Sequence, residues 1–183
     1  AEEDARIILG FNSEMNESKY LEKVSENKIT EILHSESVKT GDSFLIEPGT
    51  VHAIGAGVVL AEIQQTSDVT YRIYDWDRPG IDGEFRELHL DLALESINFE
   101  ELEAKLEYSS KEDAPIQLCS SLYFETNRLL LTKNIKRDLL SHDSFIVYMC
   151  VEGEVTIETT DFSEEMKKGE TLLIPASIAN IGI

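Results

Sequence analysis

The chain has 183 residues, 42% of them hydrophobic and 28% charged, so it can bury one core or two small ones. Its 16 basic and 36 acidic side chains give a formal net charge of −20, which argues against nucleic acid and anionic membranes as partners. An anionic substrate would also be repelled, so it would need local positive charge or a metal ion.

The first half of the chain is expected to be β-structure with two helices inserted. Residues 7–11 form a strand pattern. A helix is expected over residues 16–26, with Asn16 or Ser18 as its cap, and a second short helix over 29–34. Further strands are expected at residues 43–47, 51–54, 58–66, 69–76 and 88–92.

The second half is expected to be nearly all β. Residues 109–115 form the best linker in the chain. The strands expected after it are 122–126, 128–133, 144–151, 154–159 and 170–174. Short strands at regular spacing favour a sandwich or a jelly roll.

Cysteine usage and hydropathy indicate the compartment. Cys119 and Cys150 are expected to be reduced thiols in a reducing cytosol. No apolar run approaches the roughly 20 residues of a membrane span, and no signal peptide is visible at the start. The chain begins with Ala1 and ends on apolar residues after a turn, so we expect it to be a piece of a longer protein.

One stretch of sequence occurs twice. Residues 41–46 read GDSFLI and residues 169–174 read GETLLI, and each stretch runs into a turn containing proline. The same spacing then places His52 in the first copy and Asn180 in the second. A glycine turn, a short apolar strand and a second turn are typical of β-hairpins, and two copies suggest two related β-domains. Only the first copy carries an imidazole, so we expect the second to hold no metal.

The first copy resembles the second signature of the cupin family. That signature runs Gly, five residues, Pro, one residue, Gly, two residues, His. Gly49 and His52 are in place, whereas Glu47 stands where the proline is usual and Pro48 follows one position later.

The block from residue 50 to residue 78 is more specific. Its sequence, TVHAIGAGVVLAEIQQTSDVTYRIYDWDR, resembles the type I mannose-6-phosphate isomerases, in particular the short bacterial form. The resemblance extends along most of the chain. It implies a zinc-dependent enzyme built from cupin jelly rolls, which interconverts mannose 6-phosphate and fructose 6-phosphate through an enediol.

This resemblance implies an all-β fold with a small helical insertion and two jelly-roll domains related by the repeat. Residues 1–108 would be the remainder of the catalytic cupin domain, and residues 109–183 a degenerate C-terminal cupin domain. A glutamine, a histidine and a glutamate that complete the family's zinc site would lie upstream of the segment matching Ala1. The 183 residues alone should therefore be inactive and bind zinc weakly, and unpaired strand edges should invite association with another chain.

The resemblance also implies roles for four residues. His52 falls on a zinc-ligand histidine, Arg72 on the catalytic arginine, and Glu62 on a glutamate of the same motif. Arg78 falls where longer members carry a lysine, and we expect it to bind the phosphosugar substrate; its plainer interpretation is a solvated turn residue.

Plainer interpretations exist for the other three as well. His52 could be a turn or core histidine, and Glu62 an edge charge. Arg72 could pair with Asp75 or Asp77 at the surface. The remaining histidines are not expected to be ligands and are placed as follows: His34 at a helix end, His89 on the surface of a strand, His142 in a polar turn.

Two other functions stay open. One is a metal-free cupin that binds a sugar or assembles with a partner. The other is a cupin enzyme that uses a different metal.

Overall fold

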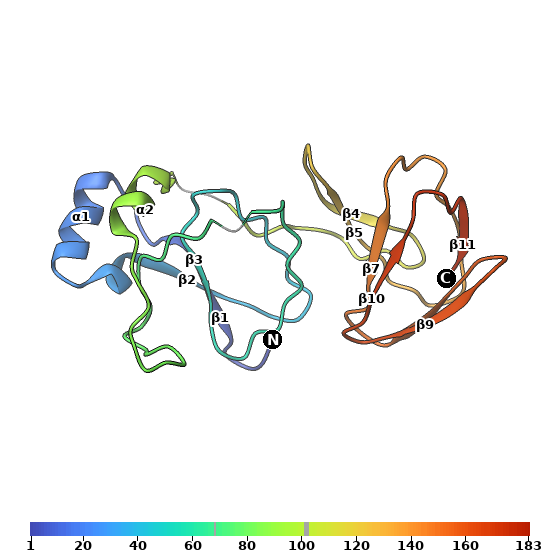
Figure 1. The fold of residues 1–183 in the computed structure, drawn as a ribbon, viewed down its shortest axis with the longest axis horizontal. Helices are drawn as coiled ribbons and strands as arrows, with labels where there is room; N and C mark the ends of the chain where they lie inside the picture. The colour runs from blue at the N-terminus through green and yellow to red at the C-terminus, as the bar shows by residue number, and fades with distance from the viewer. Residues whose placement is uncertain (68, 101–102) are drawn as a thin grey trace. The chain divides into compact units, whose positions relative to one another are not determined.

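The computed structural model describes residues 1–67, 69–100 and 103–183, and most of its regular elements are strands (Figure 1). Its α-helices are α1 at Glu17–Ser25 and α2 at Leu90–Ser96, and a 3-10 helix, η1, covers Ile29–Ile32. The chain divides into two compact units. Unit 1 is Ala1–Glu107 with Leu122–Phe124, and unit 2 is Tyr108–Ser121 with Glu125–Ile183.

Unit 1 is built on a three-stranded antiparallel sheet with the order β2-β1-β3. These strands are β1 at Arg6–Phe11, β2 at Leu33–Ser37 and β3 at His52–Ile54. Ile7 of the central strand lies opposite a residue of each neighbour and is 5% exposed. The outer edge of β3 has no strand partner within the described residues.

The helical insertion between β1 and β2 has its own small core. Asn16 caps α1, because its side-chain oxygen accepts a hydrogen bond from the backbone N–H of Lys19 at 3.0 Å. Tyr20 of α1 is 1% exposed, and its ring packs edge-on against Phe11 and Phe99. Leu94 and Ile97, in and after α2, pack on the same cluster, so α1 and α2 lie together (Figure 1).

Unit 2 is a sandwich of sheets around one core. Its four-stranded sheet has the order β6-β11-β8-β9, and two further sheets pair β7 with β10 and β4 with β5. The bounds of these strands are Ile116–Ser120 (β4), Glu125–Arg128 (β5), Lys136–Asp138 (β6), Ile146–Met149 (β7), Glu154–Glu158 (β8), Ser163–Lys167 (β9), Thr171–Ile174 (β10) and Asn180–Gly182 (β11). Ile157 from the four-stranded sheet and Ile174 from β10 are 0% and 1% exposed, so both sheets contribute to the core.

Both copies of the repeated sequence begin with the same turn. Gly41 and Gly169 both have positive φ, at 96° and 91°, a conformation that glycine adopts without steric cost. In each copy, the acidic residue after the glycine accepts a hydrogen bond from the backbone N–H three residues before it, at 3.1 Å for Asp42 and 2.7 Å for Glu170. The two turns are therefore built from the same contacts.

The repeat extends to the sheets. β3 begins at His52 and β11 at Asn180, the two residues at equivalent positions of the repeat. The order β2-β1-β3 in unit 1 corresponds to β9-β8-β11 in unit 2. Two differences stand out: residues 12–32 with their helices replace the short turn at 159–162, and β6 covers the edge of β11 that corresponds to the open edge of β3.

Several expected strands of unit 1 do not form. Residues 58–66 and 69–76, all of them described, contain no strand, and residues 43–47 make a single bridge, from Phe44 to Lys105. A strand is stable only when its backbone groups pair with a neighbour. The described residues offer these segments no neighbouring strand, and apolar side chains such as Val59 (94% exposed) stay in solvent.

The strand expected at 88–92 was wrong, because α2 begins at Leu90. Leucines at alternate positions suggested a hydrophobic period of two residues, which is typical of a strand. The packed positions are instead Ala93, Leu94 and Ile97, which recur at helical spacing. The helix expected at 29–34 was also too long, because η1 ends at Ile32 and the chain continues as β2.

In unit 2 the strands expected at 144–151, 154–159 and 170–174 are confirmed as β7, β8 and β10. The expected pair at 122–126 and 128–133 was displaced, because the observed hairpin pairs β4 with β5. β6, β9 and β11 were not expected.

Replacing Ile157 by alanine should destabilise unit 2 by about 2–5 kcal/mol, because the side chain is fully buried and the change leaves a cavity in the core. Val147→Ala is the matched control, since that side chain is 43% exposed. Urea unfolding followed on the amide NMR signals of unit 2 measures both. Equal midpoints for the two variants would contradict this assignment of the core.

Candidate functional site

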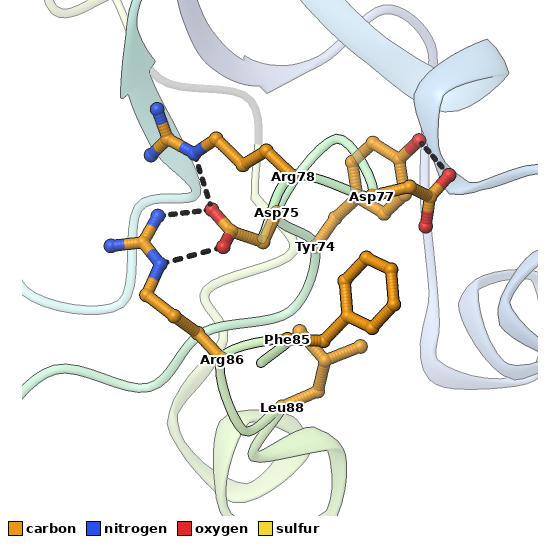
Figure 2. Close-up of a pocket in the computed structure, with 7 residues that line it drawn as sticks. All are labelled: Tyr74, Asp75, Asp77, Arg78, Phe85, Arg86 and Leu88. Atoms are coloured by element: carbon orange, nitrogen blue, oxygen red, sulfur yellow. Dashed lines mark hydrogen bonds and ion pairs between the residues drawn. The ribbon is translucent and has the colours of Figure 1, made fainter. Parts of the chain in front are cut away.

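A small pocket in unit 1 lies within the segment that leads to α2 (Figure 2). Its volume is about 90 Å³. The lining residues are Tyr74, Asp75, Asp77, Arg78, Phe85, Arg86 and Leu88. Charged and aromatic side chains thus share one short stretch of chain.

A buried carboxylate bound by two arginines lies in this pocket. The Asp75 side chain is 9% exposed and accepts hydrogen bonds from Nε of Arg86 at 2.6 Å and from Nε of Arg78 at 3.0 Å. Nη2 of Arg86 also donates to it, so the Arg86 contact is bidentate. These hydrogen bonds, that from Arg86 first, lower the pKa of Asp75 to about 2. In turn, the hydrogen bond to Asp75 raises the pKa of Arg86.

A tight turn and a hairpin bring these groups together. Trp76 and Asp77 both have positive φ, and the backbone N–H of Arg78 donates to the carbonyl oxygen of Asp75 at 3.2 Å. A bridge between Pro79 and Phe85 then reverses the chain. Arg86 therefore returns beside the residue that opened the turn.

Arg72 lies shortly before Asp75 in the chain. Its backbone joins this segment to the segment that carries Arg86. The N–H of Arg72 donates to Nδ1 of His89 at 3.1 Å, and the N–H of His89 donates to the carbonyl oxygen of Arg72 at 2.8 Å. Nη1 of Arg72 donates to the carbonyl oxygen of Glu87 at 3.1 Å. Arg72 is therefore held through backbone groups, and Asp75 pairs with two other arginines.

His89 is not the surface residue that was expected. It is half-buried, precedes α2 and contacts the Tyr71 ring at a centroid distance of 6.2 Å. His34 lies in β2 rather than at a helix end, with its Nε2 3.3 Å from a Glu36 oxygen. His142 follows a turn as expected, with its N–H donating to the carbonyl oxygen of Leu139.

His52 is the first residue of β3, opposite Leu9, and its side chain is exposed. Its Nδ1 lies 2.9 Å from the carbonyl oxygen of Thr50. A carbonyl oxygen only accepts, so Nδ1 carries the hydrogen in this contact and Nε2 is the ring nitrogen left for a ligand role. A backbone acceptor on one ring nitrogen is the usual way in which a metal-ligating histidine is oriented.

The two other expected site residues are both exposed. Arg78 follows the turn at residues 76 and 77, and its side chain is 63% exposed although its Nε donates to Asp75. Glu62 lies in the strandless stretch, and no contact among the described residues joins it to His52, Arg72 or Arg78. Asp68, part of the motif around Arg72, lies outside the described residues.

Sequence reasoning missed Asp75 and Arg86 as site residues. The available signal was a group of basic side chains in one short stretch of a chain with only 16 lysines and arginines against 36 acidic residues. The bidentate contact itself depends on the turn and the hairpin, which the pattern of apolar residues does not encode.

A complete metal site is not found in the part of the chain that the structure describes. No group of three or more His, Cys, Asp or Glu side chains there is close enough to hold a metal ion. His52 is suited to be one ligand, whereas a catalytic zinc site takes about three from the protein. Among the described helices, none combines the length and the apolar character that crossing a bilayer requires.

Comparison with known proteins gives consistent similarities. Residues 114–183 match the family model of the mannose-6-phosphate isomerase cupin domain. The chain is 33% identical to mannose-6-phosphate isomerase ManA of Bacillus subtilis (strain 168), over 95% of this chain and 55% of that protein. It is 28% identical to the mannose-6-phosphate isomerase of Streptococcus mutans, over 97% of this chain and 56% of that protein.

The fold also matches a solved structure. The crystal structure of the mannose 6-phosphate isomerase from Bacillus subtilis superposes with a TM-score of 0.87 at 24% identity, covering 99% of this chain and 58% of that one. The cupin fold and the resemblance to these isomerases are thereby confirmed. The chain spans between a half and two thirds of the length of the relatives that it matches.

Replacing Asp75 by asparagine should destabilise the fold in a pH-dependent way. The folded-state pKa of about 2 lies below the ordinary value of 3.8, so the ionised carboxylate contributes stability above pH 4. That contribution is lost as pH falls through the folded pKa. The stability difference between wild type and Asp75→Asn should therefore be constant near pH 6 and shrink between about pH 4 and pH 2.

Urea midpoints measured across this pH range test the expectation. Asp4→Asn is the control, because Asp4 is an exposed carboxylate of unit 1 without a side-chain hydrogen bond among the described contacts. A difference for Asp75→Asn that does not change with pH would show that its ion pairs do not stabilise the fold.

Proposed function

We propose that this chain is the C-terminal part of a mannose-6-phosphate isomerase, which interconverts mannose 6-phosphate and fructose 6-phosphate through an enediol. The observation that carries the proposal is the 33% identity to an isomerase of that name over 95% of the chain. The 50–78 block, with His52 at its start and Arg72 near its end, belongs to unit 1 and supports the assignment of the catalytic residues to that unit.

Arg72 is proposed to stabilise the enediolate oxygen that develops as a proton moves between C1 and C2. Its backbone is fixed by His89 and its Nη1 by Glu87, so the guanidinium starts from a held position. Its Nε and Nη2 have no partner among the described contacts and remain as donors. A fixed donor aimed at developing charge lowers a barrier because it needs no reorganisation during the reaction.

Glu62 is proposed as a group that takes part in proton transfer. A carboxylate can relay the proton when it comes within hydrogen-bond reach of the reacting carbon in the complex with substrate. Its exposed position on a segment without strand partners supports a site that forms only when further chain covers that segment.

His52 is proposed as one zinc ligand, through Nε2, with the remaining ligands supplied from outside residues 1–183. When bound, zinc would supply Lewis-acid polarisation of the sugar oxygens. The orientation of the ring by the Thr50 carbonyl oxygen supports the ligand role. Unit 2, with Asn180 at the equivalent position, is proposed to hold no metal and to serve as structural support.

The remaining proposals concern the substrate, association with another chain and the cellular compartment. The substrate is a small phosphosugar, and the open edge of β3 is where association with another strand would occur. Both cysteines are free, which supports a reducing cytoplasmic compartment.

The decisive experiment uses the longer protein from which the chain is proposed to come. It should isomerise mannose 6-phosphate and bind zinc in a 1:1 ratio, and His52→Asn should reduce both zinc content and activity by at least about tenfold. His34→Asn is the control, because that ring lies on β2 beside Glu36. Sugar binding without metal would favour the metal-free cupin, and stoichiometric binding of another metal with other chemistry would favour a different cupin enzyme.

Arg72→Lys in the longer protein should lower kcat/KM by at least about tenfold, or about 1.4 kcal/mol, since lysine keeps the charge but loses the planar fork. Arg128→Lys is the control, because Arg128 lies on β5 in unit 2. Circular dichroism verifies that each variant is folded. Wild-type kinetics in a folded Arg72→Lys variant would remove Arg72 from the mechanism.

A further inference from the structure

We infer that α2 is the support that sets the position of His52 relative to Arg72. His89, which precedes the helix, and Gly49, which contacts its end, are the positioning residues. The inference rests on the proposed function for the roles of His52 and Arg72, and on the contacts at the two ends of α2 for the support itself. Neither positioning residue is proposed to touch substrate or metal.

The start of α2 holds the backbone of Arg72. The N–H of Arg72 donates to Nδ1 of His89 at 3.1 Å, and the N–H of His89 donates to the carbonyl oxygen of Arg72 at 2.8 Å. Because Nδ1 of His89 accepts, this ring is neutral and its hydrogen lies on Nε2. The carbonyl oxygen of His89 accepts from the N–H of Ala93 in the first turn of the helix at 2.8 Å. Arg72 is therefore tied to the first turn of α2 through His89.

The end of α2 holds the turn that precedes His52. The N–H of Asn98 donates to the carbonyl oxygen of Gly49 at 2.9 Å. A Cβ atom at Gly49 would overlap the carbonyl oxygen of Ser96, the last residue of the helix. The φ of Gly49 is 86°, a value that glycine adopts without steric cost. The close approach of α2 and the backbone conformation thus both exclude a side chain at this position.

The turn passes this restraint to the imidazole of His52. The N–H of Thr50 donates to the carbonyl oxygen of Glu47 at 3.1 Å and closes the turn, and Thr50 is 7% exposed. The carbonyl oxygen of Thr50 is the acceptor for Nδ1 of His52 at 2.9 Å. A shift of Gly49 would therefore move the acceptor that orients the ring and leaves Nε2 for the metal.

The position of α2 is itself fixed by apolar packing. The helix has only seven residues, which is too short to be stable without tertiary contacts. Ala93 is 2% exposed, and Leu94 and Ile97 pack on the cluster around Tyr20 of the helical insertion. The helix is thus placed by residues other than the two whose spacing it is proposed to set.

Unit 2 provides an internal comparison. Its equivalent turn is closed by the same bond, from the N–H of Ile178 to the carbonyl oxygen of Pro175 at 3.0 Å. Ser177 stands at the position of Gly49, and unit 2, all of whose residues the structure describes, contains no helix. The copy of the repeat without an imidazole therefore makes this turn with neither a glycine nor a helix packed against it.

The plainer role of these contacts is to fasten loops to a helix. Loss of a fastening contact would lower stability and would affect metal binding and turnover together. The two ends of α2 instead reach different groups, the backbone of Arg72 at the start and the acceptor of His52 at the end. Disturbing the start should change turnover alone, and disturbing the end should change zinc affinity.

Zinc binding by the longer protein tests the end of α2. Gly49→Ala should lower zinc affinity by about tenfold, measured by competition with a chelator, because the Thr50 carbonyl oxygen no longer orients His52. In the metal-free protein, the nitrogen NMR shifts of the neutral His52 ring should show the Nδ1–H tautomer in the wild type and a mixture of tautomers in the variant. Gly153→Ala is the control, because Gly153 has a φ of 75° and nothing within 4 Å of its Cβ position.

Asn98→Pro is the second variant, because it removes the N–H donor to Gly49 and leaves the glycine in place. Ile97 has a ψ of 128°, the extended conformation that a residue before proline requires, so the substitution is compatible with the backbone there. It should weaken zinc binding and mix the His52 tautomers in the same way as Gly49→Ala.

Kinetics of the longer protein test the start of α2. His89→Gln should lower kcat by at least about tenfold and leave KM within about twofold, because Arg72 is proposed to act on charge that develops in the transition state. His89→Asn should keep the wild-type kcat, because the asparagine Oδ1 lies near the place of Nδ1 and can accept the Arg72 N–H, whereas the glutamine amide reaches past it. Zinc affinity should be unchanged in both variants.

Two results would overturn the inference. One is wild-type zinc affinity and tautomer in folded Gly49→Ala and Asn98→Pro, and the other is an equal kcat in His89→Gln and His89→Asn. If the longer protein has no isomerase activity, the proposed function fails and the tautomer of His52 decides alone. Loss of the Nδ1–H form in Gly49→Ala but not in Gly153→Ala keeps the support, and an unchanged tautomer removes it.

Discussion

The pairing of backbone groups across strands is the constraint on which this structure depends. Unit 2 satisfies it with a four-stranded sheet in which β6 covers the outer edge of β11. Unit 1 has the same order of three strands, but the equivalent edge of β3 has no partner among the described residues. His52 lies at the start of this open strand, and the apolar residues that follow it remain in solvent. The open edge and the proposed active site therefore belong to the same region.

The same constraint explains which elements the sequence could predict. The cap at Asn16, the paired glycine turns and the strand of β10 depend on residues close in sequence, and each was predicted. Residues 58–66 have the composition of a strand, but a strand needs a neighbour that this part of the chain does not offer. The error at 88–92 has another cause: Leu88 and Leu92 are exposed, and the side chains that pack are those of Ala93, Leu94 and Ile97, which recur at helical spacing.

Part of the candidate site could likewise be predicted from the sequence, and part could not. The cupin fold and the isomerase resemblance could be predicted from the 50–78 block, because that block is a contiguous motif. The roles of His52, Arg72, Glu62 and Arg78 remain proposals that rest on this resemblance. Asp75 with Arg86 could not be predicted, because the contact exists only after a turn with two positive-φ residues and a hairpin have reversed the chain.

The same loop buries a carboxylate, and its partners explain how a charge is tolerated there. Burying an unpaired carboxylate is costly, and the hydrogen bonds that Asp75 accepts from Arg86 and Arg78 offset that cost. Because Arg86 lies eleven residues after Asp75, the contact joins the start of the turn to the end of the hairpin. The carboxylate therefore holds together two segments that have no sheet between them.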